Sequence, residues 1–99
     1  RWQTMVHFDI NSDPEKVESF RDDVLSSIKE NAATMNEDSS WCRVSDISAT
    51  SVDVSINLYW DVQGGADERA EKEKFLLFIM QNARGHGLEF YDNRIRQQR

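Results

Sequence analysis

The chain has 99 residues, which is the length of one domain and enough to bury a modest core. Its 18 acidic and 12 basic residues give a net charge of -6, which repels phosphate backbones and argues against nucleic acid as a partner. The single cysteine, Cys42, excludes an internal disulfide, and the longest apolar run, Phe75–Met80, is far too short to span a membrane. We expect a soluble domain and, because the chain begins with Arg1, a piece of a larger protein.

The start of the chain predicts a strand followed by a helix. Apolar residues between Trp2 and Ile10 alternate with polar ones, as in a strand with one buried face. A helix then begins near Pro14, with either Ser12 or Asp13 as its N-cap. Its apolar stripe has helical spacing and consists of Val17, Phe20, Val24 and Ile28, widened by Leu25.

The middle of the chain predicts a β-hairpin. Residues 31–40 are polar and without periodicity, and they predict a loop. Trp41–Ile47 predicts a strand, and Ser48-Ala49-Thr50 is a short turn. Ser51–Asp61 alternates strictly between apolar and polar residues, which indicates a strand with one covered and one open face. The sheet should therefore carry helices on one side only.

The remaining residues predict a second helix over Asp67–Arg84, a stop at Gly85-His86-Gly87, a strand over Leu88–Tyr91 and a basic tail over 92–99. The order β-α-β-β-α-β predicts a ferredoxin-like α+β fold, with a four-stranded antiparallel sheet and two helices on one face. The covered face of the sheet should hold Val6, Phe8, Cys42, Val44, Val52, Val54, Ile56 and Leu58. The helices should press onto it Val17, Phe20, Val24, Ile28, Leu76 and Ile79.

No set of residues predicts catalysis, a cofactor or a metal site. RNA-recognition domains of this topology stack bases on outward aromatics, whereas the outward positions of the third strand are Asp53, Ser55, Asn57 and Tyr59. The soft metal ligands should lie on different faces: His7 toward water, Cys42 in the core and His86 in a turn. No serine has plausible His and Asp support for nucleophilic catalysis. We therefore expect a domain that is not an enzyme.

The second helix carries more apolar residues than one sheet can cover. We expect an inward line of Leu76, Ile79 and Ala83, with Phe75 at its edge. The residues left over are Leu77, Phe78 and Met80. Two explanations stay open for them, which are cover by the 31–40 loop and contact with another subunit or domain. These three residues are the candidate subunit interface.

Several segments, taken in chain order, resemble one known family. The stretch from Ser12 to Val17 contains Asp-Pro-Glu-Lys-Val, similar to an Asp-x-Glu-Lys-Val phrase that opens a helix. The stretch from Val44 to Val52 resembles a strand, a small-residue turn and a strand, and Gly87-Leu88-Glu89-Phe90 resembles a Gly-Ile-Glu-Phe ending. Together they resemble the cytoplasmic α/β domain of small-conductance mechanosensitive channels, the MscS family. The family's following Phe-Pro is absent here, which leaves open whether the tail 92–99 joins a C-terminal barrel.

The resemblance implies a homo-oligomeric channel, usually a heptamer, with a tension-gated pore. The α/β domains of such channels build a hollow cage on the cytoplasmic side of the plasma (inner) membrane or of an organellar membrane. By this resemblance the domain scaffolds the oligomer and lines ion portals, without cofactor or catalysis. The alternative that the residues leave open is a small regulatory or ligand-sensing domain of the same fold.

Overall fold

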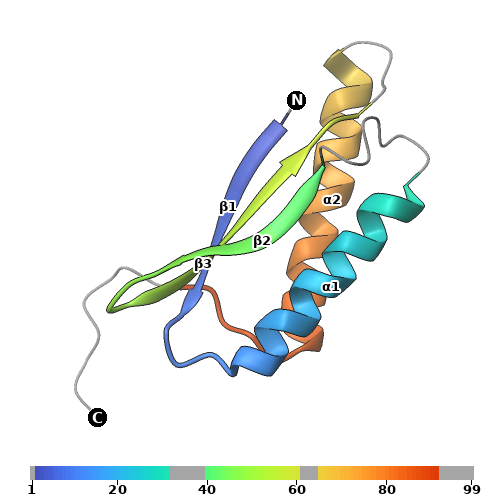
Figure 1. Cartoon of the computed structure of the whole chain (residues 1–99). Coiled ribbons are helices and arrows are strands. Elements are labelled where there is room, and N and C mark those ends of the chain that lie inside the picture. Colours follow the sequence, from blue (N-terminus) through green and yellow to red (C-terminus); the bar gives the residue numbers. More distant parts are fainter. Residues whose placement is uncertain (1, 32–39, 61–64, 92–99) are drawn as a thin grey trace.

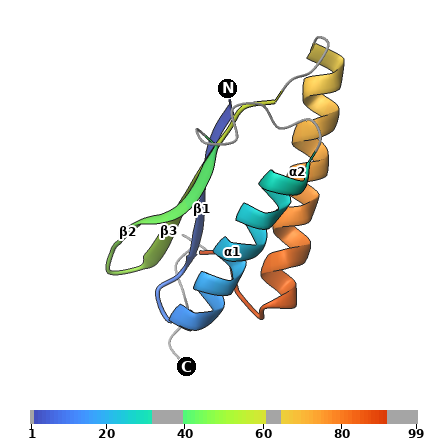
Figure 2. The ribbon, with the colours of Figure 1, turned by 45° about the vertical axis from the view of Figure 1, so that its right-hand side comes forward.

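The computed structural model describes residues 2–31, 40–60 and 65–91. The elements are, in order, β1 (Trp2–Asp9), α1 (Pro14–Glu30), β2 (Trp41–Ile47), β3 (Ser51–Leu58) and α2 (Gly65–Gly85). Both helices lie on one face of the sheet, and the described residues leave the other face open (Figures 1 and 2). The expected α+β class, with two helices on one side of an antiparallel sheet, is confirmed.

Within the described residues, the sheet has three antiparallel strands in the order β1-β3-β2. β1 pairs with β3 in unbroken register, beginning with Trp2 opposite Leu58. β2 and β3 form the predicted hairpin, with a shift in register between Val44 and Asp46. β3 is therefore the central strand, and a central strand under helices is the one whose apolar positions must alternate without a break.

The predicted fourth strand, Leu88–Tyr91, is not confirmed by the described residues, where the pairing is a single antiparallel bridge between Phe8 and Phe90. Two backbone hydrogen bonds flank this bridge, from Asp9 N to Glu89 O (3.1 Å) and from Tyr91 N to His7 O (2.7 Å). The segment follows the free edge of β1, where a ferredoxin-like fold has its fourth strand. Pairing this short does not make a ladder, so up to Tyr91 the described residues form three strands and an edge bridge.

α1 begins at its predicted signal. The Asp13 carboxylate accepts a hydrogen bond from the backbone N–H of Glu15 at 2.9 Å, and Pro14 follows it at the first helical position. This makes Asp13, and not Ser12, the N-cap. Pro is favoured there because its fixed φ suits the helix and its missing N–H would have no partner in the first turn.

α2 ends as the glycines predict. Gly87 has φ 70°, a left-handed conformation that glycine adopts without a steric penalty. This turn lets Leu88 N donate to Ala83 O at 2.9 Å, which satisfies one of the last carbonyl groups of the helix. The chain then turns back toward the edge of β1.

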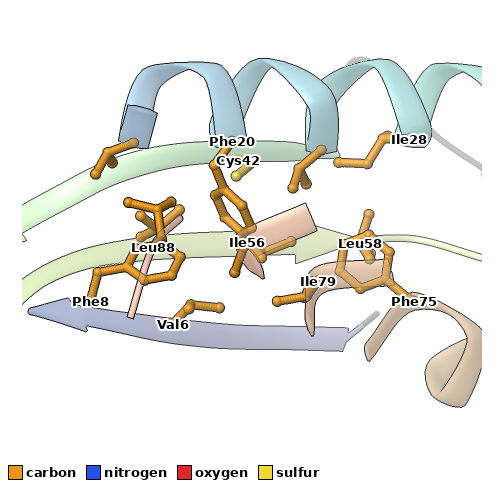
Figure 3. Close-up of a cluster of buried hydrophobic side chains, with 14 residues drawn as sticks. Val6, Phe8, Phe20, Ile28, Cys42, Ile56, Leu58, Phe75, Ile79 and Leu88 are labelled. Carbon is orange, nitrogen blue, oxygen red and sulfur yellow. The ribbon is translucent and has the colours of Figure 1, made fainter. Parts of the chain in front are cut away.

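The core lies between the sheet and the two helices (Figure 3). The predicted stripe of α1 is buried in full, and its Phe20 ring meets Phe8 of β1 edge to face at 5.0 Å. The largest side chains with almost no exposure are Phe8, Phe20, Ile56, Leu58, Val24 and Val54. β1, β3 and α1 therefore hold the centre of the core.

The hairpin end of the sheet is less covered than predicted. Val44 was expected in the core but is 44% exposed, and Val52 is only half-buried. The end of the hairpin projects beyond the helices (Figure 1), so the face that the helices cover elsewhere is open there.

α2 is rotated relative to the prediction. Its buried residues are Phe75, Ile79 and Ala83, while Leu76 is 40% exposed. Residues four apart lie almost above one another on a helix of about 3.6 residues per turn, so the line from Phe75 to Ala83 is one continuous stripe. The prediction that Leu76 faces inward, with Phe75 at the edge, is therefore wrong.

Candidate functional site

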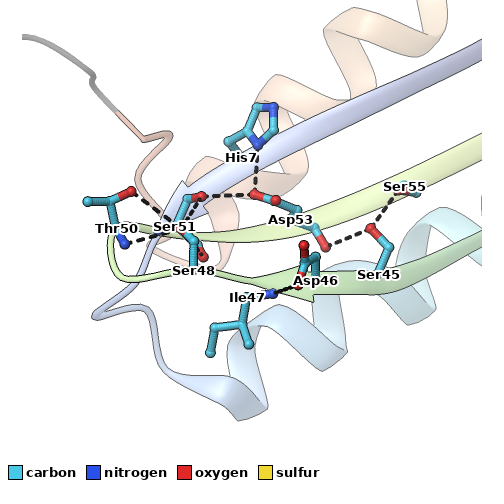
Figure 4. A network of polar contacts seen from close by, with 9 residues as sticks. All are labelled: His7, Ser45, Asp46, Ile47, Ser48, Thr50, Ser51, Asp53 and Ser55. Carbon is cyan, nitrogen blue, oxygen red and sulfur yellow. Dashed lines mark hydrogen bonds and ion pairs between the residues drawn. The ribbon is translucent and has the colours of Figure 1, made fainter.

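The open face of the sheet carries a polar network at its hairpin end (Figure 4). His7 of β1 and Asp53 of β3 are partners in the register, and His7 Nδ1 lies 2.7 Å from Asp53 Oδ1. Ser51 Oγ donates to the same carboxylate oxygen at 2.9 Å. On the neighbouring pair of strands, Ser45 Oγ and Ser55 Oγ are 2.6 Å apart. These contacts join all three strands across the face that no helix covers.

The hydrogen bonds of this network link neighbouring strands and stabilise the Asp53 carboxylate. The hydrogen bond from His7 lowers the pKa of Asp53, and the one from Ser51 acts in the same direction. A carboxylate with a lowered pKa is a weaker base. Ser51 donates to Asp53 and not to His7, so the three residues do not form the nucleophile and base pair that covalent catalysis requires.

We expect the stability that Asp53 contributes to depend on pH. Its pKa is lower in the fold than in the unfolded chain, where it is about 3.9. The contribution is therefore fully present above the unfolded pKa and is lost as the pH falls through the folded pKa. In urea unfolding, the wild type should be more stable than Asp53→Asn near neutral pH, and the difference should shrink below about pH 4. A difference that stays constant down to strongly acidic pH would contradict this assignment.

His86 and Cys42 are structural residues in the described part of the chain. His86 Nε2 lies 2.7 Å from Asp23 Oδ2 and ties the turn after α2 to α1. Cys42 is buried, and burial raises its pKa to about 12, so the thiol stays protonated. In residues 2–31, 40–60 and 65–91 no three His, Cys, Asp or Glu side chains gather as a metal site would require.

The structure separates the three residues of the candidate subunit interface. Leu77 and Met80 are 51% and 45% exposed and lie beside the exposed Leu76 on one side of α2. Phe78 is partly buried against the core, with its ring 6.3 Å from that of Phe75. We call Leu76, Leu77 and Met80 the α2 patch. The other explanation for these residues, cover by the 31–40 loop, concerns a segment that lies almost wholly outside the described residues.

Phe78 instead contributes to a groove between the two helices. This groove has a volume of about 440 Å³ and is lined by Asp23, Ser26, Ser27, Glu30, Asn31, Lys74, Phe78 and Asn82. Asn82 Nδ2 also donates to the carbonyl of Phe20 at 3.2 Å, so this side of α2 faces α1. The α2 patch therefore points away from α1.

A second groove, which the sequence did not predict, lies under the exposed end of the hairpin. It has a volume of about 290 Å³, and polar side chains at its rim include Glu18 and Arg21 of α1. We call it the hairpin groove, and its apolar lining includes Ile10, Pro14, Val44, Ile47 and Val52. The alternation of the strands correctly placed Val44 and Val52 on the helix side of the sheet, but it could not show that α1 leaves them partly uncovered.

The described residues thus define an α+β domain whose helices cover one face of the sheet and whose exposed features are apolar surfaces at the end of the hairpin and along α2. None of the described helices has a stretch long and apolar enough to cross a bilayer. No protein-family model matches the sequence, and no curated protein matches it either. Solved structures do share the fold.

Three of them are cryo-EM structures of MSL1, a mechanosensitive channel of Arabidopsis thaliana. A single-substitution variant of MSL1 superposes with a TM-score of 0.82 at 12% identity, over 93% of this chain and 35% of that one. Two other MSL1 structures give TM-scores of 0.81 and 0.80 at 11% and 12% identity, again over 93% of this chain and over 33% and 32% of theirs. The chain thus spans about a third of the length of the channel chains. The fold expected from the resemblance to MscS channels is confirmed.

Proposed function

We propose that this chain is the cytoplasmic α/β domain of a mechanosensitive channel of the MscS family. One observation carries the proposal: the fold of a mechanosensitive channel covers 93% of a chain whose segments already resemble that family in sequence order. A fold alone serves many functions. The agreement between sequence phrases and fold supports this function over an unrelated use of the same architecture.

In this role the domain scaffolds a homo-oligomeric ring, a heptamer by the resemblance, and lines the ion portals of a cage. The cage lies on the cytoplasmic side of a plasma (inner) or organellar membrane. The α2 patch supports an assembly role, because apolar side chains grouped on a surface mark contacts between proteins more often than single ones do. Of the predicted interface residues, Leu77 and Met80 are exposed and available for such a contact, while Phe78 is partly buried against the core.

The test is to reconstitute the full-length protein that contains this chain in liposomes and to record currents under membrane tension. We expect tension-gated conductance. We expect the double variant Leu77→Glu, Met80→Glu to lose most active channels, because charge on the α2 patch opposes subunit contact. Met5→Glu is the matched control, since Met5 is 47% exposed but lies on the opposite, open face of the sheet beside His7. A protein without tension-gated current would overturn the channel and favour the ligand-sensing alternative.

A further inference from the structure

Besides the single exposed side chains of Met5 and Phe90, two apolar surfaces remain uncovered on the described part of the chain, and they lie on opposite flanks. The hairpin groove is bounded by the first turns of α1 and the end of β2. The α2 patch lies on the side of α2 that points away from α1, because Phe78 and Asn82 on the other side line the groove between the helices. Figure 2 shows the ribbon of α1 between α2 and the end of the hairpin, so α1 stands between the elements that carry the two surfaces.

The two surfaces have complementary shapes, one convex and one concave. The α2 patch is convex, since Leu76, Leu77 and Met80 project from one side of a helix and all are at least 40% exposed. The hairpin groove is concave, and Ile47 at its mouth is 66% exposed. An apolar helix side that fits into an apolar groove is a common mode of recognition between proteins.

The charges around the two surfaces are also complementary. Arg84 is exposed one turn after Met80, and Arg69 lies two turns before Leu76 on the same side, with Glu73 between them, so this rim is net positive. At the hairpin groove, Arg21 is held by Asp22 at 2.9 Å, and Glu18 adds a further negative charge. The lining itself carries one charge of each sign, and the sum is -1 when Asp22, the ion-pair partner of Arg21, is counted with it, within a chain whose overall charge is -6. Opposite rims of this kind favour the approach of one surface to the other.

We infer that the α2 patch of one copy docks into the hairpin groove of the next copy. The inference deepens the proposed function, on which it rests, by naming both surfaces of the subunit contact. A contact between two different surfaces is head-to-tail, and it can repeat around a closed ring, whereas a patch that meets itself gives only a dimer. The partner is thus a second copy of this chain, and each copy uses both flanks.

Disulfide trapping of the chain of residues 1–99 tests the inference. In Ile47→Cys, Met80→Cys, oxidation should give a ladder of dimers and larger species, because each copy carries one cysteine on each flank. The two cysteines cannot join within one copy, because α1 and the core lie between them and a disulfide needs Cα atoms within about 7 Å. The native Cys42 does not interfere, since it is buried and protonated. Met5→Cys, Met80→Cys is the matched control, with one cysteine on the open sheet face. It should form disulfide-linked species only at the background level.

The single variants separate the possible contacts. Mixing Ile47→Cys with Met80→Cys should give a dimer and nothing larger, while each variant alone should give almost none. A dimer formed by Met80→Cys alone at the same rate as the mixture would show that the α2 patch meets itself and would overturn the inference. The inference would also be overturned if Ile47→Cys, Met80→Cys formed no more disulfide-linked species than the control variant at the highest soluble concentration. The disulfide trapping needs no membrane, so its result is independent of the current recordings. Absent crosslinks with tension-gated currents would overturn the docking alone. Crosslinks without such currents would support the docking in a protein that is not a channel.

Discussion

Replacing Ile56 with alanine should lower the free energy of unfolding by about 2–5 kcal/mol, the usual cost of truncating a large buried side chain. Ile56 is 1% exposed and sits in the central strand, opposite Thr4 of β1 and Cys42 of β2. Both neighbouring strands and the helices hold the surrounding side chains in place, so the cavity left by the missing atoms cannot close. Urea unfolding followed by far-UV circular dichroism measures the loss.

Ile47→Ala is the matched control, because it removes the same atoms from the same sheet. Ile47 is 66% exposed at the end of the hairpin, so this substitution should change the free energy of unfolding by no more than about 0.5 kcal/mol. Comparable costs at the two positions would show that the hairpin end is packed and that the hairpin groove does not exist in solution.

This pair of isoleucines also shows what periodicity can and cannot predict. Alternation reports which face of a strand a residue occupies, because side chains in a strand point to opposite faces in turn. It predicted β2 with its observed bounds, Trp41–Ile47, and it placed Ile56 in the core. It does not report how far along the strand a helix extends its cover. That length depends on where α1 begins relative to the hairpin, which is a tertiary property.

A similar limit explains Asn57, which the alternation placed on the wet face. Asn57 is 2% exposed, although it does belong to the open face of the sheet. Its partners in the register are Gln3 on β1 and Trp41 on β2, and directly paired residues share a face. The pairing thus places Asn57 beside the large side chain of Trp41 on this face. The register, which the sequence alone did not fix, decides this burial.

The exposure of the candidate interface residues was predicted only in part, for a related reason. The six residues Phe75–Met80 are all apolar, so the run contains no polar position that would mark the outward side of the helix. Sequence could show that apolar residues were in excess, but not which ones. Aromatic packing fixes the rotation of α2. The ring centroid of Phe75 lies 5.8 Å from that of Trp2 and 6.3 Å from that of Trp60, and both tryptophans are distant from Phe75 in the sequence.

The rotation of α2 makes a second prediction with a large effect. Phe75→Ala should lower the free energy of unfolding by about 3–5 kcal/mol, since Phe75 is 6% exposed and its ring joins the cluster of Trp2, Trp60 and Phe78. Leu76→Ala, one position along the same helix, should cost less than about 1 kcal/mol, because Leu76 is 40% exposed on the α2 patch.

Urea unfolding of both variants, followed by tryptophan fluorescence, compares the two positions directly. Trp2 and Trp60 stack on each other with ring centroids 5.5 Å apart and both meet Phe75 edge to face, so the emission of the folded Phe75→Ala protein should shift as well. Leu76→Ala should leave that emission unchanged. The reverse order of stability would mean that Leu76 faces the sheet. The α2 patch would then lose one of its three residues to the core, and the proposed contact between copies would lose its convex surface.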